Sequence, residues 1–73
     1  MKLDDVRISL SAARISAGLT QRQAAEIGKV DRHTLGKWER GESKPDYFQL
    51  CGMAYIYKIP VECIIMPKKI TKR

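Results

Sequence analysis

The chain has 73 residues, of which 44% are hydrophobic and 30% charged, and these are the proportions of an ordinary folded domain. A chain of this length builds one small core and leaves little room for a deep catalytic pocket, so we do not expect an enzyme. Fourteen Lys and Arg against eight Asp and Glu give a net charge of +6, which favours a polyanionic partner, nucleic acid or an anionic membrane.

Two further properties indicate where the protein works. No stretch approaches the ~20 consecutive apolar residues of a membrane span, and the first residues lack the basic-then-apolar order of a signal peptide. We therefore expect a cytoplasmic protein without a membrane partner. Cys51 and Cys63 lie in apolar surroundings, without a Cys or His at a metal-binding spacing, and are interpreted as reduced core thiols, a disulfide being the alternative. We expect no metal site and no cofactor.

The first half of the chain predicts two helices. The first runs from Leu3 to Ala17, where apolar residues recur at helical spacing at Leu3, Val6, Leu10, Ala13 and Ala17. Gly18 is expected to end it in the left-handed conformation. Thr20 and Gln23 form a capping-box pair, which predicts a second, short helix over Gln21–Ile27.

A third helix follows after about three residues. Asp31 is a good N-cap for a helix over Arg32–Arg40, and Gly41 is expected to end it. On this helix Leu35 and Trp38 lie on one face, so we interpret Trp38 as a core residue.

The second half predicts two more helices. Asp46 and Gln49 form another capping pair, before a core stripe at Leu50, Met53, Ala54 and Tyr57. Pro60 is expected to open a last helix over Val61–Met66, followed by a basic tail at 67–73. With no strand-like alternation visible, the fold class is all-α with five short helices.

The second and third predicted helices are joined by a tight turn. This helix-turn-helix arrangement is the one that places one helix in the DNA major groove. The segments Gly-Leu-Thr-Gln, Ala-Ala-Glu, Val-Asp-Arg and Trp-Glu-Arg-Gly between residues 18 and 41 resemble the Cro and repressor-type helix-turn-helix family of phages and bacteria. The resemblance covers Val6 to Ile65. It implies a lambda-repressor-like DNA-binding domain over residues 1–66, with its helix-turn-helix at the second and third helices.

The resemblance also implies roles for individual residues. It assigns contacts with base edges to Arg32, His33 and Lys37, and contacts with phosphates to Gln21, Thr34 and Lys44. Arginine and lysine donate to guanine O6 and N7, and histidine donates to an acceptor base, whereas phosphate contacts set register and salt-dependent affinity. Solvated surface charge is the alternative interpretation of the basic residues. Arg14 and Glu39 match positions that pair across the first and third helices, and we interpret them as a structural ion pair.

The sequence departs from the family pattern in two places. Its turn reads Gly28 and then Lys29 where the family has an apolar residue and then glycine, so either the glycine is shifted by one or Lys29 adopts a positive φ. Gly36 lies inside the third helix, where it costs up to ~1 kcal/mol relative to alanine. Either it permits a close backbone approach, to DNA or to another helix, or it is tolerated neutrally.

The distribution of charge along the chain favours a homodimer. Residues 67–73 hold +4 of the net charge and residues 22–44 only +2, so a monomer would have few contacts with a duplex and a homodimer would double them.

Two groups of apolar residues exceed what the core needs. Apolar side chains of the last helix are candidates for that two-fold interface, namely Val61, Ile64 and Ile65, with Cys63 and Met66. On the first helix a second patch, Ile8, Ala12 and Ile15, is expected to be exposed.

Two functions remain open at this stage. The first is a small Cro-like transcriptional regulator that binds double-stranded operator DNA through the helix over residues 32–40. The second is a helix-turn-helix protein that acts mainly by binding another repressor protein, with the patch on the first helix as its docking surface.

Overall fold

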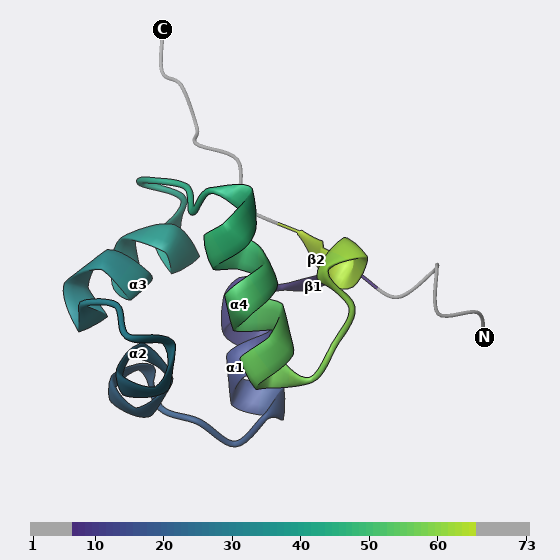
Figure 1. The fold of residues 1–73 in the computed structure, drawn as a ribbon, viewed down its shortest axis with the longest axis horizontal. Helices are drawn as coiled ribbons and strands as arrows, with labels where there is room; N and C mark the ends of the chain where they lie inside the picture. The colour runs from purple at the N-terminus through teal and green to yellow at the C-terminus, as the bar shows by residue number, and fades with distance from the viewer. Residues whose placement is uncertain (1–6, 66–73) are drawn as a thin grey trace, which may run out of the picture.

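A computed structural model describes residues 7–65 of the chain. In chain order it contains β1 (Ile8–Ser9), α1 (Leu10–Ser16), α2 (Gln21–Gly28), α3 (Arg32–Arg40), α4 (Tyr47–Tyr57), a 3₁₀ turn η2 (Val61–Cys63) and β2 (Ile64–Ile65). Figure 1 shows α4 lying across α1, with α2 and α3 on one side of this pair and the two short strands on the other. The described part of the chain is thus four helices and a small sheet.

The first helix is shorter than predicted. It begins at Leu10 instead of Leu3, because the Ser9 hydroxyl accepts a hydrogen bond from the Ala12 amide at 3.1 Å and caps the helix there. The apolar positions Leu3 and Val6 lie outside the described residues. Leu10 and Ala13 are buried as expected, whereas Ala17 is the exposed C-cap of α1.

The three central helices begin where their caps predict. Thr20 and Gln23 form a complete capping box at α2, and Asp46 and Gln49 form one at α4. The Asp31 carboxylate accepts the His33 amide at 2.9 Å and starts α3. These starts depend on side chains within three residues of the helix, which explains why the sequence alone locates them.

The predicted helix over Val61–Met66 is wrong. The chain makes one 3₁₀ turn and then extends, and β2 pairs in parallel with β1, so that Ile8 lies opposite Ile64 and Ser9 opposite Ile65. Branched side chains suit a strand, and β1 supplies a hydrogen-bonding edge that is remote in the sequence. Two-residue strands are too short to show an alternating pattern.

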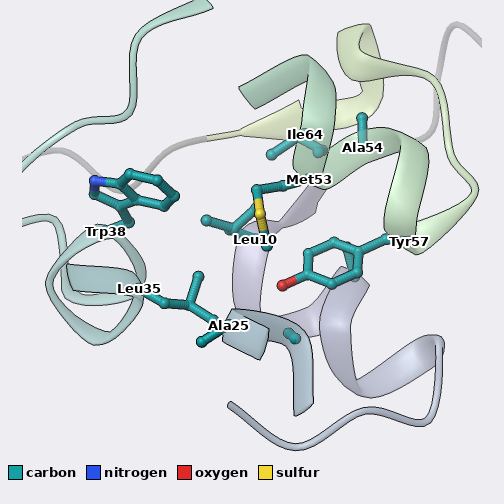
Figure 2. Packing of buried hydrophobic residues seen from close by; sticks show 10 residues of the cluster. Leu10, Ala25, Leu35, Trp38, Met53, Ala54, Tyr57 and Ile64 are labelled. Carbon is teal, nitrogen blue, oxygen red and sulfur yellow. The ribbon is translucent and has the colours of Figure 1, made fainter. Parts of the chain in front are cut away.

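The core lies where the four helices and the sheet meet (Figure 2). Leu10, Leu35 and Met53 are its largest fully buried side chains, and Trp38 is 3% exposed, as expected for a core residue. Figure 2 shows the ring of Tyr57 entering this cluster from α4, with its hydroxyl pointing inward. Helix α3 is therefore held through Leu35 and Trp38, which leaves its opposite face open.

In the turn between α2 and α3, the positive φ falls on Lys29 and not on Gly28. Lys29 takes the left-handed conformation at φ 57°, and Gly28 remains the last residue of α2. A β-carbon at Gly28 would lie 3.1 Å from Met53 Sδ and 3.3 Å from Ile56 Cδ1, so a side chain there would require Met53 and Ile56 to shift by a few tenths of an ångström. The glycine thus serves helix packing, and the neighbouring lysine carries the strained backbone.

Candidate nucleic-acid interface

The outer face of α3 carries the side chains predicted to read DNA. Arg32, His33 and Lys37 are all exposed, while Leu35 and Trp38 on the opposite face are buried. Residues 33 and 37 are one helical turn apart, so His33 and Lys37 project to the same side. The structure thus brings together the three predicted base-contacting residues on one accessible helix face.

A polar hollow of about 330 Å³ opens beside these residues, where α3 meets the start of α2. Its lining consists of Gln21, Asp31, Arg32, His33, Gly36 and Arg40. Gly36 lies at the floor, where a β-carbon would meet Arg40 Nη1 at 3.1 Å and Gln21 Nε2 at 3.9 Å. Both neighbours are ends of flexible side chains, and Gly36 itself is buried beneath them.

Arg40 is a candidate that the sequence analysis missed. Arg32, Gly36 and Arg40 follow one another at four-residue intervals, which places them on one stripe of α3. This spacing was visible in the sequence and could have identified Arg40 as a candidate. Its guanidinium donates to the Glu42 carboxylate at 2.8 and 3.2 Å, and both side chains are about half exposed. This hydrogen bond raises the pKa of Arg40 and lowers the pKa of Glu42.

Glu42 places a negative charge at the edge of the basic face. After the hydrogen bond from Arg40, the nearby charges of Arg40, Lys37 and His33 lower the pKa of its carboxyl further. The carboxylate is therefore ionised at neutral pH and offsets part of the positive potential that a phosphate backbone would meet.

A buried polar network joins three helices behind this face. Arg14 of α1 and Glu39 of α3 form the expected ion pair, with Nε to Oε2 at 2.8 Å and Nη2 to Oε1 at 3.3 Å. Their side chains are only 13% and 6% exposed. Arg14 also donates to the Leu19 carbonyl at 2.9 Å, which ties the chain between α1 and α2 to the same group.

Gln21 belongs to this network as well as to the hollow. Its Nε2 donates to Glu39 Oε1 at 2.9 Å, a structural bond that the sequence analysis did not foresee. The phosphate contact predicted for Gln21 stays a prediction. Thr34 is half-buried on α3 and Lys44 is exposed in the loop before α4, and their phosphate contacts also stay predictions.

The residues predicted for protein interfaces are separated by the structure. Ile8 lies in β1 and packs against the core, so it does not share a helix face with the exposed Ala12 and Ile15. Near the C-terminus Val61 packs against the core and Ile64 is 8% exposed, which leaves Ile65 at 45%. Both patches lose members because β1 and β2 replace the predicted helical segments; Met66 lies outside the described residues.

Residues 7–65 provide neither the ligand cluster of a metal site nor a membrane-spanning helix. This part of the chain contains no group of three His, Cys, Asp or Glu residues that could hold a metal ion. None of its helices is long and apolar enough to cross a membrane. Cys51 is half-buried on α4 and Cys63 is buried in η2.

Comparison with known families gives one result. A model of the family described as helix-turn-helix matches residues 10–62, which span α1 through η2. Comparisons with curated proteins and with solved structures returned no match. The family match agrees with the Cro and repressor-type resemblance of residues 18–41. The exposed basic face of α3 and the buried network behind it both lie within the matched residues. The chain belongs to the helix-turn-helix family and is a DNA-binding transcription regulator.

Proposed function

We propose that the protein is a sequence-specific regulator of Cro type that binds operator DNA with α2 and α3 as its helix-turn-helix. In this proposal α3 enters the major groove with its outer face toward the bases. The observation that carries it is the two-sided character of α3, whose one face is anchored by Leu35 and Trp38 while the other exposes Arg32, His33 and Lys37.

The exposed side chains suit the chemistry of base edges. Arg32 and Lys37 donate to guanine O6 and N7, and a ring N–H of His33 donates to an acceptor base. Because Arg32 and His33 stand in the first turn of α3, the N-terminal end of the helix enters the groove first, as in other helix-turn-helix complexes.

Contacts with the phosphate backbone would set the register. Thr34 and Lys44 flank the reading face, and Gln21 keeps a second amide N–H besides the one donated to Glu39. The +2 charge of residues 22–44 is modest for a surface meeting a duplex, so orientation by hydrogen bonds has to supplement electrostatic attraction.

The buried network supports this function by holding α3 in place. Glu39 accepts from Arg14 and Gln21, so one carboxylate fixes α3 against both α1 and α2. Recognition of base edges requires side chains held to within fractions of an ångström, and a helix anchored from behind meets that requirement.

The test uses a duplex selected from a random pool with the purified protein. Arg32→Ala and Lys37→Ala are each expected to weaken binding to the selected duplex by about 1–3 kcal/mol, with thermal stability nearly unchanged because both side chains are exposed. Arg7→Gln removes the same charge from an exposed residue just before β1, on the side of the α1–α4 pair opposite α3, and serves as the control. The proposal fails if binding survives both alanine changes or falls equally in the control.

A further inference from the structure

Helix α4 presents an apolar face that the fold leaves uncovered. Its sequence, Tyr47–Tyr57, contains no charged residue, and a helix that is apolar all round is normally covered on every side. Met53, Ala54 and Tyr57 are buried in the core, but Phe48 is 87% exposed and Tyr55 is 85% exposed. Leaving two aromatic side chains in water is unfavourable and indicates a contact surface.

The two aromatic residues share one side of the helix. Tyr55 follows Phe48 by seven positions, which corresponds to nearly two full turns and about 10 Å along the axis. Between them lies the exposed Gly52, where a β-carbon would meet nothing within 4 Å. The face therefore has a projecting ring at each end and a low centre.

An apolar groove opens next to Tyr55. It has a volume of about 650 Å³, and Tyr55, Ile27, Ile56 and Leu19 contribute apolar side chains to its walls. Ile27 of α2 is itself 54% exposed. Lys58 is the one charged residue among those that line it. The surface thus combines a projecting ring, Phe48, with an apolar groove two turns away.

We propose that this face binds a second copy of the chain, with the two α4 helices antiparallel across a two-fold axis that passes near Cys51 and Gly52. In that arrangement Phe48 of each copy packs on Tyr55 and Ile27 of the other, at the mouth of the groove. A two-fold interface requires that a surface be complementary to itself, and a projection and a groove equally distant from the axis satisfy this requirement.

The lack of charged residues on α4 makes its face a better contact for a second copy than for DNA. Two chains of net charge +6 repel each other, and α4 offers them a contact face without a charged residue of its own. With Lys58 as its one charged lining residue, the groove offers a phosphate backbone little to bind. Phe48 and Tyr55 lie on α4, so neither belongs to the reading face of α3.

The expected dimer is weak. Aromatic side chains bury roughly 150–250 Å² each, so covering Phe48, Tyr55 and Ile27 in both copies removes on the order of 1,000 Å² from water, the low end of specific interfaces. We expect a dissociation constant on the order of 10–100 µM in the absence of DNA. This inference deepens the proposed function, since a two-fold regulator reads two half-sites.

Sedimentation equilibrium without DNA tests the dimer separately from the proposed function. The wild-type protein is expected to show reversible self-association, which Phe48→Asp and Tyr55→Asp each weaken by at least about tenfold. Phe48→Ala should weaken it without adding a charge. Ile65→Asp makes the same charge change at an exposed isoleucine of β2 and is expected to leave the association constant within about twofold.

Further measurements make each outcome decisive. Circular dichroism should show all four variants folded, since Phe48 and Tyr55 are largely exposed and Ile65 is 45% exposed. Backbone NMR shifts of the wild-type protein should change on dilution at Phe48, Gly52 and Tyr55 and stay constant along α3. A wild-type monomer at millimolar concentration, or dissociation by Ile65→Asp with no effect of Phe48→Asp, would overturn the proposal whether or not the protein binds its duplex.

Discussion

At the scale of single residues, Tyr57 shows how the core accommodates a polar atom. Its hydroxyl is buried and has no hydrogen-bond partner among residues 7–65, and this burial, followed by the nearby Glu39 charge, raises the pKa of Tyr57 to about 12. The sequence analysis assigned Tyr57 to the core because of its position on the apolar stripe of α4, which contains no information about the hydroxyl. An orphaned buried hydroxyl costs about 1–3 kcal/mol relative to the same group in water.

We therefore expect Tyr57→Phe to stabilise the fold at neutral pH by up to about 1 kcal/mol, measured by thermal or urea denaturation. The difference should depend on pH. Because the folded pKa of about 12 exceeds the ordinary value of 10.0, the wild-type protein keeps its stability below pH 10 and loses some of it as the pH rises toward 12. The phenylalanine variant lacks this loss, so the gap between the two should widen over that interval. A destabilised Tyr57→Phe would show that the hydroxyl has a partner in solution.

At the scale of elements, one ion pair connects helices that the chain places far apart. Arg14 and Glu39 are 25 residues apart and bring α1 to α3, while Gln21 adds α2. We expect Arg14→Ala or Glu39→Ala to destabilise the fold by about 3–5 kcal/mol each, because either change leaves a largely buried charge without its partner. The double change should cost clearly less than the sum, and a double-mutant cycle by urea denaturation measures the difference. Additive effects would mean that the two charges do not interact.

Gly36 connects the stability of α3 with its function. Alanine in place of this glycine should stabilise the free protein by about 0.5–1 kcal/mol, since the new methyl meets only the ends of the Arg40 and Gln21 side chains and the helix gains propensity. If the α3 backbone approaches DNA at this hollow, the same change weakens binding to the selected duplex. Gly52→Ala provides the matched control for stability, because its β-carbon meets nothing within 4 Å. Unchanged DNA affinity in Gly36→Ala would leave neutral tolerance as the explanation of this glycine.

At the scale of the whole molecule, charge is distributed unevenly over the surface. Of the net +6, residues 67–73 hold +4 and residues 22–44 hold +2, and Glu42 reduces the positive potential next to Arg40 and Lys37. A negative charge at this edge weakens attraction to any duplex regardless of its sequence. We therefore expect Glu42 to lower the affinity for every duplex, whatever its sequence.

We accordingly expect Glu42→Gln to tighten binding to unselected duplexes and to make the dependence of log K on log salt steeper by about one unit, as for one added phosphate contact. Glu62→Gln in η2 removes the same charge away from α3 and should change neither quantity. Fluorescence titrations between low and physiological salt measure both slopes. Equal slopes for the two variants would show that Glu42 does not face the DNA.

Several features of this protein follow from the sequence by itself, because they depend on neighbours within a turn of helix. The caps at Thr20, Asp31 and Asp46 and the buried positions Leu35 and Trp38 are local properties of this kind. The exposure of Arg32 and Lys37 follows from the same helical period. The pairing of Arg14 with Glu39 was expected only from the family resemblance, since no local rule connects residues so far apart.

Other features were decided by the tertiary structure, because they depend on contacts between remote segments. The pairing of Ile8 with Ile64 turns two predicted helical stretches into strands, and it exists only once β1 and β2, which are remote in the sequence, meet. The turn depends on remote contacts too, since Met53 of α4 packs closely against Gly28 and the left-handed conformation falls on Lys29. The helical period of the sequence predicts which side of its own helix a residue occupies. Only the packing of the other elements determines what covers that side, and α4 buries Met53 while leaving Phe48 and Tyr55 exposed for this reason.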